Sequence, residues 1–377
     1  MDYSVTAYSS KELLNDNIGF YSGTPALDLF PRNKWNKIAG QAFREAPISA
    51  FGYDFPQGRP ELTNTLVNYL KKTRGINCHS DQIIITTGAK QGLSLIAKCL
   101  LKSENEAWIE DPSNDNVRKI FSYHTNHIVP IAVDNKGIRP ELFPADSSPT
   151  LIFITPSHQF PLGGILPIQR RLEIIRYASR TGCYVVEDDY DSEFRYSGLP
   201  ISSLHELDNQ RVIYIGTFSK TMFPSLRLGY IVLPDSLIKQ CRELKRLGDH
   251  HTNSLNQLSL MRFIESGEME RHVAHMKKIY QKRHDALISC LNAYFLGKIK
   301  IIGENAGMHV VAEFLEVDFT IELIHKIKEA GVDIISVEEH SIKKGLHKNQ
   351  IILGYAHLCE KDIEKGLFIL KNVLTST

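Results

Sequence analysis

Short apolar runs alternate with amphipathic segments through the first two thirds of the chain. Helical stretches lie between the runs, as at 89–102 and 168–182, and Gly182 closes the second as a C-cap would. Continuous apolar strands separated by helices predict an α/β domain with a mostly parallel sheet, covered on both faces. The apolar runs that we read as strands are 83–87, 107–110, 127–133, 151–155, 183–187, 212–216 and 228–233.

The pattern changes after residue 233, where 254–295 is one long helical stretch. A smaller mixed region follows, in which strands at 309–314, 332–337 and 351–356 alternate with helices at 320–330 and 360–374. We expect three parts. They are an irregular N-terminal arm at 1–40 that packs on the small domain, a large α/β domain at 41–245, and a bridging helix with a small α+β domain at 246–377.

The composition excludes some classes of protein but does not point to a reaction. The 377 residues are 42% hydrophobic and 23% charged with a net charge of +1, so no global field favours nucleic acid or an anionic membrane. No apolar run approaches the roughly 20 residues of a membrane span, and we expect no signal peptide at the start. The six cysteines are scattered without a CxxC pair, which indicates free thiols and a cytoplasmic protein.

Reactive residue types gather at the ends of the predicted strands. "TTGAKQG" at 86–92 passes from strand to helix, where the backbone amides of Ala89 and Lys90 would favour an anion. "TFSKTMFPSLR" at 217–227 supplies two hydroxyls, an amine and a guanidinium; the residues are Thr217, Ser219, Lys220 and Arg227. Because carboxyl ends of parallel strands form the ligand crevice, we expect these groups to meet there.

A second acidic segment, "EDDYDSEF" at 187–194, places Asp188 and Tyr190 just beyond a strand. We expect Asp189, on the alternate face, to be more solvated. No metal is expected, because no histidine pair stands at ligand spacing beside these acids. An anion seat, a Schiff-base lysine, a carboxylate for a ring nitrogen and a phenol for a ring oxygen together meet the needs of pyridoxal 5′-phosphate.

The sequences of these segments resemble those of fold-type I pyridoxal-phosphate aminotransferases. Within that family it resembles the aminotransferase-like, effector-binding domain of MocR-type transcriptional regulators, a branch of the GntR family. The resemblance covers nearly the whole chain. The motifs that carry it are "TPSHQFPLG", "EDDYDSEFRY", "VIYIGTFSKTMFPSLRLGYIVLP" and "ESGEMERHVAHMKKIYQKRHDAL".

The resemblance implies a role for each matching residue. Lys220 would hold the cofactor as a Schiff base, Asp188 would meet the pyridine nitrogen, and Tyr190 would meet the phenolate oxygen. Tyr53, in "YDFPQG", would reach the phosphate of the neighbouring subunit, which implies a homodimer. The phosphate would be held by Thr217, Ser219, Arg227 and the amides of Ala89 and Lys90.

The chain departs from the enzyme pattern at two positions. Phe160, also at the cofactor, replaces the asparagine of N-P-T-G, and Ile352 stands where the family has an arginine that clamps the substrate carboxylate. A bidentate arginine gives amino acids both affinity and orientation, so its loss disfavours turnover of α-amino acids. The residues expected to face an effector are Gly23, Asn114, Asn116, His158 and Ile352.

These features favour a sensor over an enzyme. An amine or amino-acid-like effector would displace Lys220 to form an external aldimine and change the contacts between the domains. DNA would be bound by a winged-helix domain that this chain does not contain, since no basic helix-turn-helix stretch precedes residue 40. The effector stays open among an amino acid, a dipeptide such as D-alanyl-D-alanine, and the cofactor itself. The alternative is a stand-alone pyridoxal-phosphate aminotransferase.

Overall fold

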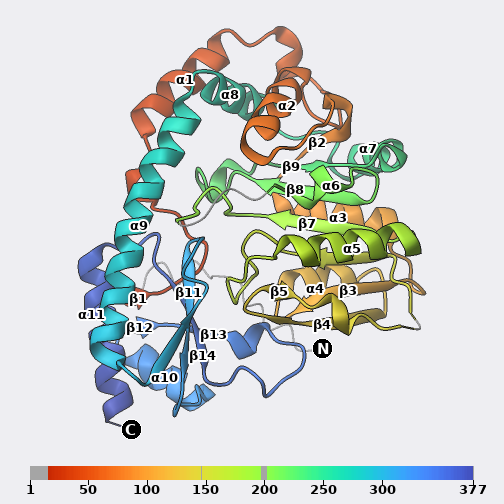
Figure 1. Ribbon diagram of the computed structural model, residues 1–377. Coiled ribbons are helices and arrows are strands. Elements are labelled where there is room, and N and C mark those ends of the chain that lie inside the picture. Colours follow the sequence, from red (N-terminus) through yellow and green to blue (C-terminus); the bar gives the residue numbers. More distant parts are fainter. Residues whose placement is uncertain (1–15, 146, 197–201, 377) are drawn as a thin grey trace.

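The computed structural model describes residues 16–145, 147–196 and 202–376 (Figure 1). An eight-stranded sheet forms its larger part, with the strand order β2-β9-β8-β7-β6-β3-β4-β5. Strands β3, β4, β6, β7 and β8 pair in parallel, which confirms the mostly parallel α/β sheet. The bounds are β2 Ile83–Thr86, β3 Glu106–Asp111, β4 His127–Asp134, β5 Gly137–Ile138, β6 Leu151–Ile154, β7 Tyr184–Asp189, β8 Val212–Thr217 and β9 Gly229–Val232.

Two strands run against the others, the short edge strand β5 and the inner strand β9. β9 is antiparallel to both of its neighbours, β8 and β2, so β2 again points the same way as the parallel strands. The start of β9 therefore lies at the edge where β2 and β8 end. The apolar pattern of β9 does not distinguish the two directions, because a fully buried strand is apolar either way.

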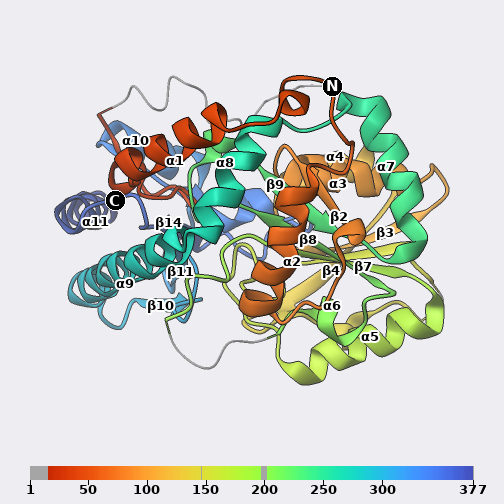
Figure 2. The same ribbon diagram turned by 90° about the horizontal axis from the view of Figure 1, so that it is seen from above.

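Helices cover both faces of this sheet (Figure 2). Leu93 of α3 and Phe121 of α4 pack on Ile84 and Phe153 on one face, while Ile174 of α5 packs on the other face of the sheet. Helix α5 ends at Gly182, whose φ of 81° confirms the predicted C-cap. The helices of this part are α2 Pro60–Arg74, α3 Ala89–Leu100, α4 Asp115–Ser122, α5 Ile168–Thr181, α6 Leu204–Leu207 and α7 Asp235–Asp249.

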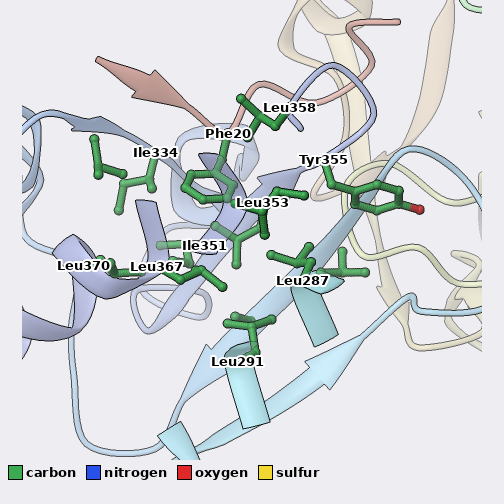
Figure 3. Packing of buried hydrophobic residues seen from close by; sticks show 14 of the residues in the cluster. Phe20, Leu287, Leu291, Ile334, Ile351, Leu353, Tyr355, Leu358, Leu367 and Leu370 are labelled. Atoms are coloured by element: carbon green, nitrogen blue, oxygen red, sulfur yellow. The ribbon is translucent and has the colours of Figure 1, made fainter. Parts of the chain in front are cut away.

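The C-terminal part is a smaller α+β unit. Its four-stranded sheet has the order β10-β11-β14-β13, with antiparallel pairs throughout. The long helix α9, Glu268–Phe295, places Met269 in the large domain's core and Leu287 and Leu291 in the small domain's core (Figure 3). The remaining bounds are β10 Ile299–Ile302, β11 His309–Phe314, β12 Val332–Asp333, β13 Ile335–Ser336, β14 Gln350–Gly354, α8 Ser254–Glu265, α10 Ile321–Glu329 and α11 Glu360–Thr375.

The N-terminal segment that we expected to be irregular divides into two parts. β1, Ile18–Gly19, pairs with β12, and Phe20 is buried in the small domain's core beside Leu353 (Figure 3). Residues 32–44 instead form helix α1, Arg32–Arg44, which packs beside α8. Trp35 provides the reason, because its ring packs edge-on against Phe223 and Phe263. Residues 1–15 of the predicted arm lie outside the described part of the chain.

No helix among the described residues has both the length and the apolar composition needed to cross a bilayer.

Candidate functional site

Most of the predicted site residues follow strands that end at one edge of the large sheet. Lys220 comes after β8, Asp188 and Tyr190 lie at the end of β7, and His158 follows β6. Ala89 follows β2, so the sheet's topology gathers segments that lie far apart in the sequence. Arg227 belongs to the same edge because it directly precedes the antiparallel β9.

Lys220 is held by the N-terminal segment. Its Nζ donates to the carbonyl oxygen of Gly23 at 2.6 Å. Gly23 has a φ of 68°, and a Cβ on it would lie 2.8 Å from the same Nζ, so only glycine fits. Burial lowers the pKa of the Lys220 amine, and the carboxylates of Asp191 and Asp188 act against that shift. The structure thus brings together Gly23 and Lys220, which the sequence pattern could not join.

Asp188 provides a carboxylate with a free position. Its Oδ1 is buried and has no hydrogen-bond partner among the described residues. Burial, with the neighbouring Asp189 charge, raises the pKa of Asp188 to about 7. A buried carboxylate without a partner is costly, so this oxygen suits a cationic group such as a protonated ring nitrogen. By that test the site fits a pyridine-type cofactor bound at Lys220.

The other end of the site is built to receive an anion. Helix α3 begins at Ala89 after Gly88, and a Cβ on Gly88 would lie 3.1 Å from Nη2 of Arg227. The guanidinium therefore sits at the amide end of the helix, where it donates to the Thr87 carbonyl. Thr217 and Ser219 turn their hydroxyls toward each other at 3.1 Å. A helix terminus, a guanidinium and two hydroxyls are the groups that phosphate accepts from.

Three further predicted residues are linked to these groups by direct contacts. Asn114 caps α4 by accepting from the Asn116 backbone N–H at 3.0 Å. Nζ of Lys90 donates to the Asn116 side chain at 3.2 Å, which ties α4 to the anion end. Phe160 lies deeper, with its ring centroid 6.4 Å from that of Tyr190.

Two predicted residues lie apart from this group. Ile352 of β14 is fully buried and packs with Leu162 and Val311, with Phe160 against the same cluster. It therefore forms an apolar layer behind Phe160. Tyr53 is 86% exposed, with its ring 4.9 Å from His250, and its proposed reach into a second subunit stays a prediction.

The expectation that Asp189 is solvated was wrong. Its side chain is buried and accepts from Arg74 Nε at 2.8 Å and from the Tyr214 hydroxyl at 2.7 Å. The strand does turn Asp189 away from Asp188, but α2 covers that face and delivers Arg74 to it. Asp189 is thus part of the fold, while Asp188 is available to a ligand.

Exchanging the two carboxylates should separate these roles. We expect Asp189→Asn to lower the free energy of unfolding by roughly 1–3 kcal/mol, because it removes one of the two carboxylates that pair with the buried Arg74 and leaves only Glu193. Asp188→Asn should be neutral near pH 4 and stabilising by roughly 4 kcal/mol near pH 8. The sign follows because the raised pKa of Asp188 makes wild-type stability fall as pH rises from about 4 to about 7 and level off above that.

Urea unfolding of the cofactor-free protein between pH 4 and 8 measures both effects. A larger stability loss in Asp188→Asn than in Asp189→Asn would contradict the assignment.

Comparison with known proteins agrees with this geometry. The sequence profile of the family aminotransferase class I and II matches residues 17–345. The HTH-type transcriptional regulator YhdI of Bacillus subtilis (strain 168), itself named as uncharacterized, is 36% identical and aligns with 94% of this chain and 75% of its own length. The probable rhizopine catabolism regulatory protein MocR of Rhizobium meliloti is 31% identical over 95% of this chain and 72% of its own.

Solved structures show the same fold. The kynurenine aminotransferase of Pyrococcus horikoshii, crystallised with PMP, superposes with a TM-score of 0.89 at 26% identity and covers 99% of this chain and 95% of its own. Pyridoxal 5′-phosphate is the cofactor that the family brings with it, and Lys220 and the unpartnered Asp188 oxygen fit it. This chain belongs to the aminotransferase class I and II family and shares its aminotransferase-like fold with MocR-type transcriptional regulators.

Proposed function

We propose that this chain is the effector-sensing and dimerisation domain of a MocR-type transcriptional regulator, with pyridoxal 5′-phosphate held at Lys220. The similarity to the HTH-type transcriptional regulator YhdI over 94% of the chain and to the regulatory protein MocR over 95% supports the regulator class. The observation that carries the sensing role is the contact between Lys220 Nζ and the Gly23 carbonyl. A reactive amine in direct contact with the N-terminal segment can report its own chemical state to that segment.

The residues of the site divide the work of binding. Asp188 offers a carboxylate to the ring nitrogen, and Arg227 with the start of α3 offers donors to the phosphate. When bound, the cofactor supplies an aldehyde that a primary amine can capture in place of Lys220. Lys220 would then be a free amine, the form that donates to the Gly23 carbonyl here, so this hydrogen bond is the contact that differs between the two states.

The N-terminal segment provides a route from the site to the rest of the molecule. Three residues before Gly23, Phe20 is buried in the small domain's core, and β1 pairs with β12. A shift at Gly23 therefore acts on the small domain as well as on the cofactor. In this proposal the altered domain contacts are read by a winged-helix DNA-binding domain outside this chain, and the protein acts in the cytoplasm, where the DNA is.

A homodimer is part of the proposal. Residues 48–55 expose large apolar side chains, among them Ile48 at 92%, Phe51 at 57% and Phe55 at 54%. Tyr53 stands in the same segment with its hydroxyl unused by any described hydrogen bond. Clustered exposed apolar side chains typically mark a protein–protein contact, so this segment supports a subunit interface.

The alternative is an aminotransferase enzyme, which the likeness to the kynurenine aminotransferase favours. The apolar layer formed by Leu162, Val311 and Ile352 argues against an α-amino acid substrate, because it offers no donor to a carboxylate. We therefore propose as effector a primary amine that does not depend on a carboxylate clamp at this position.

The first prediction concerns Lys220. The purified protein should absorb in the visible range, and borohydride reduction should fix the cofactor to the peptide that contains Lys220. Lys220→Ala should lose both the band and the adduct, whereas Lys245→Ala, which removes another buried lysine, should keep them. Mass spectrometry of the reduced protein provides the measurement, and a covalent adduct in Lys220→Ala would refute the assignment.

The second prediction concerns the missing clamp. Ile352→Arg should gain affinity for α-amino acids by about tenfold to a hundredfold, as expected for a charged hydrogen-bonding pair. Ile352→Leu keeps the apolar layer and should change nothing. The measurement is the spectral shift of the cofactor-loaded protein during titration with the twenty amino acids. Rapid conversion of wild type to the amine form of the cofactor would instead support the enzyme.

The third prediction concerns the dimer. Ile48→Asp should convert a dimer into a monomer in sedimentation equilibrium, because it places a charge in the apolar contact. Leu296→Asp provides the control, since Leu296 is 80% exposed at the far end of α9. A wild-type monomer at micromolar concentration with full cofactor occupancy would rule out this part of the proposal.

A further inference from the structure

A buried polar cluster joins the two domains beside the site. His158 and Asp191 belong to the loops after β6 and β7, and His309 belongs to β11 of the small domain. Each of the three side chains is about 1% exposed. Nδ1 of His158 lies 3.0 Å from Oδ2 of Asp191, and the two imidazole rings are 4.8 Å apart at their centroids.

The hydrogen bonds of this cluster determine where its protons lie. An ionised carboxylate only accepts, so His158 must carry its proton on Nδ1 to bond Asp191. The Tyr190 hydroxyl lies 3.1 Å from the same nitrogen. It donates a hydrogen bond to the His158 carbonyl oxygen at 2.8 Å, and its oxygen can share the Nδ1 proton with Asp191. Ring and backbone of His158 thus both hold the Tyr190 hydroxyl.

A glycine of the small domain presses against this pair. A Cβ on Gly307 would lie 2.2 Å from Nδ1 of His158 and 2.8 Å from Oδ2 of Asp191. Gly307 is itself anchored, because its carbonyl accepts from the Tyr355 hydroxyl at 2.8 Å. The backbone of the small domain therefore packs directly against the pair.

The charge of the pair reaches Lys220. Among the groups that act on the Lys220 amine, Asp191 provides the strongest attraction, followed by Asp188, while Lys90 repels. On the far side of His158, burial lowers the pKa of His309 to about 3, with His158, His340 and Lys220 acting in the same direction. His309 is therefore neutral, and its ring packs against His158 without adding a charge.

We propose that Asp191 and His158 are positioning residues of this site, which fix the Tyr190 hydroxyl and hold a negative charge beside Lys220 while the small domain is closed. The pair acts on the protein's own lysine and tyrosine. This inference rests on the proposed function only in the identity of the ligand that Lys220 and Tyr190 bind.

The same atoms raise the question of a metal ion. His158, Asp191 and His309 each offer a ligand atom within 4.8 Å of the others, and His158 Nε2 and His309 Nδ1 have no partner among the described residues. Each ring also bonds through its other nitrogen, as metal ligands do. We favour the positioning pair because the Asp191 carboxylate bonds His158 directly and its charge acts on the Lys220 amine.

Two substitutions test the pair. Asp191→Asn keeps the shape and an acceptor but removes the charge, and His158→Phe keeps a ring but removes the donor. The control is Glu187→Gln, a fully buried carboxylate at the same strand whose oxygens accept from the backbone of Leu204 and His205. It should lower stability without touching the site.

Two readouts are needed. One is the pH midpoint of the visible band of the cofactor-loaded protein. The other is the pH midpoint of Lys220 in the cofactor-free protein, from NMR of its ¹³C-methylated amine. We expect Asp191→Asn to lower both midpoints by about one pH unit, because it removes an attraction for the protonated amine. His158→Phe should shift them the same way, since it removes the hydrogen bond that holds the Asp191 carboxylate in place.

The double variant should shift no further than Asp191→Asn alone, and Glu187→Gln should leave both midpoints at the wild-type value. Gly307→Ala, which forces the domains apart at the pair, provides an independent variant if Asp191→Asn does not fold, and it should shift the midpoints downward. Unchanged midpoints in Asp191→Asn, or in Gly307→Ala in its place, would overturn the proposal. So would a stoichiometric divalent cation in wild type, found by elemental analysis and lost in His309→Leu.

Failure of the proposed function remains distinguishable. A protein that shows no visible band would still report on the pair through the Lys220 amine.

Discussion

The structure depends on keeping a lysine amine and an unpaired carboxylate buried at one edge of a sheet. Neither Lys220 nor Asp188 is stable there alone, because burial opposes the charged form of each. Their neighbours reduce the cost by fixing positions, through the Gly23 carbonyl for the lysine and Asp191 for its charge. A site held in this strained electrostatic state is ready for a ligand that supplies the missing partners.

The sheet makes this arrangement possible because its strands are long-range neighbours with a common direction. β7 and β8 pair in parallel with Asp188 opposite Ile215, which sets Asp188 within reach of the segment that carries Lys220. The antiparallel β9 brings Arg227 back to the same edge. The anion end and the amine end thus share one scaffold, and the distance between them is fixed by strand spacing.

The small domain is joined to the site by small residues at close contacts. Gly23 and Gly307 lie where a Cβ would collide with Lys220 and with His158. At these points the backbone itself lies against the site, with no side chain in between. In a regulator such direct contact is what a signal requires, whereas an enzyme needs it only for closure.

The residue pattern by itself determined the α/β class, and it predicted a large and a small domain and a cluster of Lys220, Asp188 and Arg227. Buried strands and helix caps are local signals, and the resemblance rests on contiguous phrases, so both can be read along the chain.

Only the tertiary structure decided which side chains meet. Asp189 is buried because Arg74, 115 residues away, lies over it, and His309 meets His158 because β11 of the small domain is docked there. The N-terminal arm is divided between two domains for the same reason. Phe20 packs in the core of the small domain, and Trp35 packs against the core of the large one. Periodicity shows which face of an element is apolar, but the neighbour that covers a polar residue is set by packing between segments distant in sequence.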